Sequence, residues 1–265
     1  MYDTTYHRPS SVAEASQKVA SAEDGKILAG GQTLIPTMKQ RLASPSDLVD
    51  IGALADLKGI DVGGDTVAIG AGTTHAEVAG SGAVGGAIGA LSALAGMIGD
   101  PHVRHAGTIG GSIANNDPAA DYPAAALGLG ATIETNKRSI SADSFFTGLF
   151  ETALDDDEII TRVTFPIPAS AGYAKFPNPA SRYAMVGVFV AKMKDGSVRV
   201  AVTGAGDNGV YRSSSHEQAL AGNWSQASVS GVSVGASGML SDMHGSAEYR
   251  AHLVSVMAGR AVASS

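Results

Sequence analysis

The sequence predicts an α+β protein made of three successive units. Up to about residue 166, short apolar or alternating segments typical of strands are interleaved with helical segments. Prolines and glycine cluster at residues 166–179, and beyond them two β-rich runs precede helical segments, which indicates an α+β layer. We therefore expect units at residues 1–60, 61–166 and 167–265, the last a small domain of antiparallel sheet plus helices.

In the first unit the pattern predicts a small sheet with two helices. The first ten residues mix aromatic and polar side chains, which favours an extended arm. Residues 11–22 carry Val12, Ala15 and Val19 on one helical face. The other elements expected here are a strand after Lys26, a short helix at residues 34–42 and a strand at residues 47–51.

The second unit is expected to hold buried Ala-rich helices between strands. A turn at residues 61–64 precedes a strand at 66–70, and Thr74 followed by Glu77 has the spacing of a capping box. The acidic run at residues 155–158 is interpreted as a solvated loop rather than a metal site, because uninterrupted acidic runs are usually exposed. The other predicted elements are helices at 84–98 and 123–130 and strands at 131–134 and 159–166.

The third unit is expected to be a hairpin sheet covered by helices. Two β-rich runs, residues 183–193 and 198–204, are joined by an Asp-Gly turn. Residues 225–241 are expected to form a loop with one short β segment. Helices are predicted at residues 213–221 and 246–263, the second with Tyr249, Leu253, Val256 and Met257 on its buried side.

The composition is that of a globular protein and excludes several classes of partner. Hydrophobic residues make up 44% of the 265 residues and charged residues 16%. The formal net charge of −7 and the lack of a Lys/Arg cluster argue against a nucleic-acid partner. No apolar run reaches the length of a membrane span, and the first ten residues do not resemble a signal peptide. We expect a cytoplasmic protein.

One functional signal is the stretch Thr108-Ile109-Gly110-Gly111-Ser112. Adjacent glycines allow positive φ and a close approach to a ligand, and successive N–H groups in such a turn favour an anion. Asp117 and Asp121 follow, and their carboxylates can accept hydrogen bonds from hydroxyls. The stretch fits a ligand with phosphate oxygens and sugar-like hydroxyls. An ordinary glycine turn before a buried helix explains it equally well on its own.

A second double glycine favours the ligand interpretation. In Leu28-Ala29-Gly30-Gly31-Gln32-Thr33-Leu34-Ile35, the glycines follow an apolar strand and precede a segment that can be helical. Thr33 is an acceptable N-cap, and the free N–H groups of a first helical turn attract anions. Two loops of similar build indicate one diphosphate held between them. Neither loop has the G-x-G-x-x-G spacing of a Rossmann fold.

These motifs resemble one protein family. AGGQT at residues 29–33, TIGGS at 108–112 and DPAAD at 117–121, in this order, are similar to the flavin-binding medium subunits of the molybdenum hydroxylases. That family includes the medium subunit of carbon monoxide dehydrogenase, its relatives among aldehyde, quinoline and nicotine-type dehydrogenases, and the FAD domain within xanthine dehydrogenase. The resemblance covers nearly the whole chain.

The resemblance implies a two-subdomain FAD-binding fold of the vanillyl-alcohol-oxidase (PCMH) type, followed by the small C-terminal domain. It assigns both glycine loops to the FAD diphosphate, and Tyr183 is a candidate for covering the flavin ring. Asp117 either contacts the cofactor or orders its loop. The residues placed at FAD are Leu28, Ala29, Gly30, Gly31, Gln32, Thr33, Leu34, Ile35, Ile98, Thr108, Ile109, Gly110, Gly111, Ser112, Asp117, Asp121, Ile160, Tyr183 and Met185.

The resemblance also implies electron transfer within a larger enzyme. A large molybdopterin subunit would oxidise the substrate, a small subunit would carry two 2Fe-2S clusters, and FAD on this chain would pass the electrons to an external acceptor. A dimer of such heterotrimers is the expected assembly. The sequence contains no cysteine, so any iron–sulfur cluster must be held by another chain.

Two other functions are weighed against this one. A free-standing flavin-dependent oxidase would have its own substrate pocket, and a nucleotide-binding module would have no redox function. No recognisable frame of Ser, His and acidic residues supports acid–base or nucleophilic catalysis, so no catalytic residue and no metal ligand is assigned. His102, Arg104 and His105 precede the second glycine loop. They either add charge beside a diphosphate, or Arg104 pairs with a nearby carboxylate while the histidines are solvated.

Overall fold

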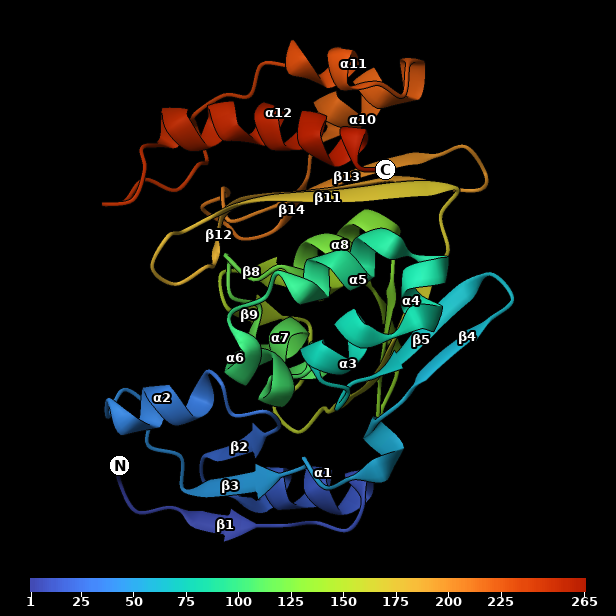
Figure 1. Cartoon of the computed structure of the whole chain (residues 1–265). Coiled ribbons are helices and arrows are strands. Elements are labelled where there is room, and N and C mark those ends of the chain that lie inside the picture. The colour runs from blue at the N-terminus through green and yellow to red at the C-terminus, as the bar shows by residue number, and fades with distance from the viewer.

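The computed structural model, which describes residues 1–265, has the predicted α+β fold (Figure 1). Three larger sheets follow one another along the chain, and in Figure 1 the N-terminal one lies at the bottom and the C-terminal one at the top. One sheet falls in each unit expected from the sequence, a division at residues 60 and 166 that we continue to propose. None of the helices combines the length and the hydrophobicity that a membrane crossing demands.

The N-terminal unit contains β1 (Thr5–His7), α1 (Val12–Ser21), β2 (Gly25–Leu28), α2 (Leu34–Lys39), β3 (Asp47–Asp50) and the 3-10 helix η1 (Ala55–Leu57). Its strands form a parallel sheet in the order β1-β3-β2. The expected extended arm is therefore partly a strand, since Thr5 pairs with Asp47. Ala15 and Val19 of α1 pack with Val49 in a separate core of 7 buried residues.

The second unit contains β4 (Ile60–Gly63), β5 (Thr66–Gly70), α3 (His75–Gly80), α4 (Gly82–Ala87), α5 (Gly89–Gly96), α6 (Pro101–Ala106), α7 (Ile109–Asn115), α8 (Tyr122–Leu129), β6 (Thr132–Thr135), β7 (Ser139–Ser141), α9 (Ala142–Phe145), β8 (Phe146–Gly148), β9 (Glu151–Thr152) and β10 (Ile160–Pro166). Its main sheet is antiparallel, in the order β4-β5-β10-β6-β7. The predicted capping box is confirmed, because Thr74 and Glu77 bond each other's backbone N–H groups.

Two predictions for this unit are wrong. Residues 61–64 are not simply a turn, because β4 ends at Gly63 and the hairpin turns at Gly64, which has φ +58°. The helix expected at residues 84–98 is instead α4 and α5, which meet at Ile88. Glycines crowd this segment, and glycine weakens a helix interior.

The third unit contains β11 (Ser170–Pro177), β12 (Ala184–Lys192), β13 (Val198–Thr203), β14 (Tyr211–Arg212), α10 (Ser214–Gly222), α11 (Gln226–Ser230) and α12 (Ala247–Ala263). The predicted hairpin is confirmed, with Lys192 paired to Val198. Two expectations are wrong: β11 occupies the proline-rich boundary, and Tyr249 is 42% exposed. Within the loop expected at residues 225–241, Met239 forms an isolated β-bridge with Gly206, and residues 226–230 form the helix α11, which was not predicted.

The sheet of the third unit lies between two helical layers (Figure 1). Its outer face packs against α12, and its inner face packs against α5 and α8 of the second unit. Accordingly β12 is buried on both faces. Phe189 and Ala201 of this sheet belong to the 29-residue core of the second unit, so the two units share one hydrophobic core.

Candidate functional site

A cleft of about 1030 Å³ lies where the three units meet. Its lining comes from residues 19–34 of the first unit, from the helical region and the 150–160 segment of the second, and from residues 180–183 of the third. The cleft brings together all the predicted site residues except three. Ile109 is fully buried in the core, Met185 is buried beside Gly245, and Ile35 packs behind Gly31.

The first glycine loop presents free backbone donors to this cleft. The N–H groups of residues 30–33 have no acceptor within the chain, and Gly31 takes φ +67°. The loop is half-buried to exposed, so these N–H groups are open to solvent or to a ligand in the cleft. A ligand that carries oxygen atoms at this loop would supply the missing acceptors.

Two hydroxyl groups beside the loop are also free. Thr33 stands at the N-cap position of α2 as predicted, but its side chain does not cap the helix, because its backbone is already helical. The Ser112 hydroxyl on α7 makes no hydrogen bond within the chain either, and both residues line the cleft. Each hydroxyl can therefore donate to, or accept from, a bound molecule.

The second glycine loop is built differently from the prediction. Thr108 caps α7 by accepting a hydrogen bond from the Gly111 N–H at 3.1 Å. The N–H groups of Ile109 and Gly110 donate to the carbonyls of Thr73 and Ala71. The prediction of a nest of free N–H groups at this loop is wrong, because these donors already have acceptors. Neither glycine of the loop has positive φ.

Close packing explains the glycines of this region. A Cβ on Gly110 would lie 2.5 Å from the Cβ of Ala71, and a Cβ on Gly30 would lie 2.1 Å from the carbonyl oxygen of Ala106. The missing side chains let the first loop lie directly against the connection between α6 and α7. The two glycine motifs therefore meet in space, as their pairing in the sequence predicts.

Asp121 is not the free hydroxyl acceptor that the sequence indicated. It is buried, and its two carboxylate oxygens accept hydrogen bonds from the Tyr173 hydroxyl and, at 3.0 Å, from the Lys175 ammonium. Burial raises the pKa of Asp121, while both partners on β11 favour its ionised form. The carboxylate ties the start of α8 to the third unit at the floor of the cleft.

Asp117 does order its loop, which was one of the two alternatives. Its Oδ1 accepts the Ala119 N–H at 2.9 Å, and Oδ2 has no partner within the chain. Burial raises the pKa of Asp117. Asp117 lines the cleft, so its free oxygen is available to accept a hydrogen bond from a ligand.

The charged residues before the second loop do not line the cleft. Arg104 donates to the carbonyls of Ile98 and Gly99, not to a carboxylate, and His105 bonds the carbonyl of Pro101. The cleft lining includes neither of them, nor His102. Both earlier interpretations are therefore wrong for Arg104, which holds the Ile98 loop in place.

His75 is a cleft residue that sequence reasoning missed. It is buried beneath Gly107, packs against the Tyr122 ring in a tilted arrangement with 5.3 Å between ring centroids, and its Nδ1 has no hydrogen-bond partner. Burial lowers the pKa of His75 to about 4, with a smaller contribution from Arg104. The only signal for it was its place directly after Thr74 of the capping box.

The acidic run at the edge of the cleft is held by two cations. Lys137 pairs with Asp155 and Asp157, and Arg138 pairs with Glu158. The Arg138 guanidinium lowers the pKa of Glu158 to about 2. No group of three or more metal-ligating side chains forms anywhere in the chain.

The comparisons with known proteins follow this geometry. Residues 2–168 match the family described as the FAD binding domain in molybdopterin dehydrogenase. The nicotine 6-hydroxylase medium subunit of Paenarthrobacter nicotinovorans is 36% identical, over 97% of this chain and 95% of its own. The carbon monoxide dehydrogenase medium chain of Hydrogenophaga pseudoflava is 32% identical over the same shares of the two chains, 97% and 95%. This chain belongs to the FAD-binding medium subunits of the molybdenum hydroxylases.

Solved structures agree with the fold of this medium subunit. A chain of the reconstituted carbon monoxide dehydrogenase from Oligotropha carboxidovorans matches it with a TM-score of 0.90 and 32% identity, covering 99% of this chain and 97% of that one. A chain of quinoline 2-oxidoreductase from Pseudomonas putida 86 matches with a TM-score of 0.87 and 27% identity, covering 98% and 96%. The match extends over the C-terminal unit, beyond the residues of the family description.

The free groups of this medium subunit fit FAD. A diphosphate offers acceptors for the N–H groups of residues 30–33. Ribityl hydroxyls suit the free Thr33 and Ser112 hydroxyls and the open Oδ2 of Asp117. The unpartnered His75 Nδ1 is a further buried polar atom in the cleft wall.

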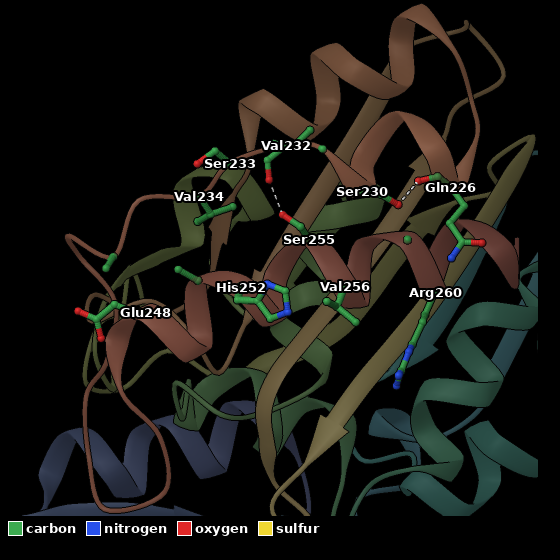
Figure 2. A pocket seen from close by; sticks show the side chains of 14 residues that line it. Gln226, Ser230, Val232, Ser233, Val234, Glu248, His252, Ser255, Val256 and Arg260 are labelled. Atoms are coloured by element: carbon green, nitrogen blue, oxygen red, sulfur yellow. Dashed lines mark hydrogen bonds between the residues drawn. The ribbon is translucent and has the colours of Figure 1, made fainter.

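A second cavity of the medium subunit, about 610 Å³, is lined by residues of the third unit alone and by neither glycine motif (Figure 2). It lies along α12, between that helix and the segment after α11. Ser255 and Ser230, which line it, already donate to the carbonyls of Val232 and Gln226. The glycine motifs lie elsewhere, so we place the function in the larger cleft.

Proposed function

We propose that this medium subunit binds FAD in the cleft and passes electrons from iron–sulfur clusters on a partner subunit to an external acceptor. The observation that carries the proposal is the row of unpaired N–H groups at residues 30–33, packed against the second glycine motif. A flavin accepts and releases electrons one or two at a time, which is the chemistry such a relay needs.

The chain's own residues bind and orient the cofactor. The first loop donates to the diphosphate, and Gly111 leaves room for it beside Ala29. The Thr33 and Ser112 hydroxyls and Asp117 hold the ribityl chain, and Ile98, Ile160 and Tyr183 surround the flavin ring. Asp121 acts through Lys175, by fixing the floor of the cleft.

We further propose a small 2Fe-2S subunit and a large molybdopterin subunit as partners, in a dimer of heterotrimers in the cytoplasm. The absence of cysteine supports this, because the clusters need thiolate ligands that the chain does not have. The relatives support it too, since they are named as medium subunits of oxidoreductases.

Replacing Gly31 tests the FAD site. Gly31→Ala introduces a Cβ at φ +67° in the loop, and we expect the dissociation constant for FAD to rise at least about tenfold, because the loop must shift its N–H groups. Gly64→Ala is the matched control, since it has φ +58° in an open hairpin turn and should cost similar stability without affecting FAD. Flavin absorbance titration of the apoprotein measures both.

Two results would contradict the proposal. Wild-type apoprotein that takes up no flavin would remove FAD from the cleft. A purified chain that binds flavin and oxidises an organic substrate by itself, without partner subunits, would replace the electron-transfer role with that of a free-standing oxidase.

A further inference from the structure

Phe150 stands at the rim of the cleft in an unusual backbone conformation. Its side chain lines the cleft, is 58% exposed, and its φ is +55°. Bulky residues rarely adopt positive φ, because Cβ then crowds the following carbonyl oxygen. Strained residues of this kind persist only where their surroundings hold them, and they concentrate at functional sites.

Asn116 holds Phe150 in place. It ends α7, has φ +42° itself, and its carbonyl accepts the Phe150 N–H at 3.3 Å. Its buried side-chain amide donates to the carbonyls of Gly148 and Glu151 at 2.9 and 2.8 Å. The turn between β8 and β9 is thus fixed to the helix that opens with the second glycine motif.

This strain lies mainly at the cleft. Four non-glycine residues have positive φ: Arg41, Asn116, Phe150 and Arg182. Phe150 and Arg182 line the cleft, and Asn116 bonds the backbone of Phe150. Arg41 lies outside the cleft. A glycine at position 150 would make the same turn without strain and without leaving an aromatic ring in water. The ring itself must therefore contribute something that glycine cannot.

We propose that Phe150 forms one wall of the cofactor site, where its ring packs against bound FAD and shields it from water, and that Asn116 is the residue that positions it. The inference rests on the proposed function, because FAD must occupy the cleft. Aromatic rings pack favourably against flat conjugated rings, and FAD has two such ring systems. Phe150 and Tyr183 are the two exposed aromatic side chains in the cleft lining.

The test compares three variants of the full chain: Phe150→Gly, Phe150→Leu and Phe150→Tyr. Phe150→Gly relieves the strain, so the apoprotein should melt about 2–4 °C higher. The same variant should bind FAD about three- to tenfold more weakly and leave the bound flavin more open to fluorescence quenching by iodide, which reports how well the site shields it. Phe150→Tyr should match the wild type, and Phe150→Leu should lie between them. A turn residue of purely structural importance would gain stability and lose nothing.

Arg41→Gly is the matched control, because it relieves the same strain outside the cleft. It should raise the melting temperature and leave FAD affinity and fluorescence unchanged. Asn116→Gly keeps the left-handed backbone and removes the two hydrogen bonds of the amide, and it should lose part of the protection of bound flavin against iodide.

The outcomes separate the two proposals. If the wild type binds FAD and Phe150→Gly binds it with equal affinity and equal quenching, the role of Phe150 is wrong while the FAD site stands. If only association with a partner subunit changes, Phe150 is a partner contact and the inference is also wrong. If Phe150→Gly does not fold, the FAD affinities of Phe150→Leu and Phe150→Tyr are compared instead, and equal affinities would contradict the role of the ring. Failure of the wild type to bind FAD overturns both proposals.

Discussion

At the scale of single residues, the buried pair of Asp121 and Lys175 joins the second and third units at the cleft. The side chains are 4% and 3% exposed, and Lys175 also donates to the carbonyl of Met97. Ion pairs of this kind contribute little net stability, but breaking one leaves an uncompensated buried charge. In the proposed FAD site, Asp121 would therefore act on the cofactor through the shape of the cleft.

Asp121→Asn should lower the free energy of unfolding by about 3–5 kcal/mol, because Lys175 stays buried without its counter-charge. Urea denaturation of the apoprotein measures this. The double variant Asp121→Asn/Lys175→Met should recover most of the loss. Asp65→Asn, which breaks the exposed pair with Lys194, is the control and should change little. An equal loss of unfolding free energy in Asp121→Asn and Asp65→Asn would show that burial of the Asp121 pair does not matter.

His75 should make stability depend on pH. Its folded pKa of about 4 lies below the value of about 6.5 in an unfolded chain, so the unfolded chain binds the proton first as pH falls. Stability from this group is complete above pH 6.5 and is lost between about pH 6.5 and pH 4. Burial lowers the pKa of His216 as well, with the same sign.

Between pH 7 and pH 5 we expect His75 alone to cost about 2 kcal/mol of unfolding free energy. Denaturant unfolding of the wild type and of His75→Gln at the two pH values measures it, since the variant should lose that part of the slope. NMR titration of the His75 ring checks the cause directly. A ring that titrates near pH 6.5 in the folded protein would rule out this account.

The sequence could predict which residues line the cleft but not how each is used. Two glycine motifs marked the loops, and nearly all the residues assigned from them lie together. The Asp121 pairing was missed because Tyr173 and Lys175 lie on β11, a strand that the sequence did not predict. The glycines also looked alike in sequence, although Gly31 needs positive φ and Gly110 needs space beside Ala71.

At the scale of elements, α12 is tied to the third sheet through a buried arginine. The Arg250 guanidinium donates to the carbonyls of Met185 and Gly204 at 2.7 and 2.8 Å and pairs with Asp242. These carbonyls lie at facing ends of β12 and β13, next to the Tyr183 segment of the cleft. One side chain therefore aligns a helix, two strand ends and a cleft wall.

Arg250→Met should lower the free energy of unfolding by about 3 kcal/mol or more, because two buried carbonyls lose their donor at about 1–3 kcal/mol each. Arg260→Met, an exposed arginine on the same helix, is the matched control and should have almost no effect. Thermal or urea unfolding compares them. Similar losses would mean that helix propensity, not the carbonyl contacts, explains the cost.

Elements were predictable where one local signal dominated. The hairpin of β12 and β13 and the capping box of α3 followed from a few adjacent residues. β11 was missed because prolines surround it, yet it is an edge strand, where proline is tolerated. α11 was missed because it is only five residues long and its one start signal is the Ser225 cap, whose hydroxyl accepts the Ser228 N–H.

At the scale of the whole molecule, the cleft joins parts of unequal stability. The second and third units share a core of 29 buried residues, and the third adds one of 14. The N-terminal unit has only 7, and Ile159 is the member contributed by the second unit. A ligand across the cleft therefore stabilises the N-terminal unit most.

FAD at about one hundred times its dissociation constant should raise the free energy of unfolding by about 2.7 kcal/mol. Limited proteolysis should show which part of the chain FAD stabilises. We expect residues 1–60 to be cut first without FAD and to be protected when FAD is bound. Cleavage in the rest of the chain should change little. Mass spectrometry of the fragments identifies the sites. Uniform protection of the chain would show that the units do not open separately.

The small core of the N-terminal unit also bears on how fast the cofactor leaves. Its sheet carries the loop of residues 30–33, so a local opening of that sheet would uncover the diphosphate proposed to bind there without disturbing the larger shared core. The lifetime of bound FAD would then depend on how fast the sheet of β1, β2 and β3 opens. The sum of contacts between FAD and the closed cleft would matter less. A partner subunit that binds this sheet would slow its opening and so lengthen the lifetime of bound FAD without contacting FAD.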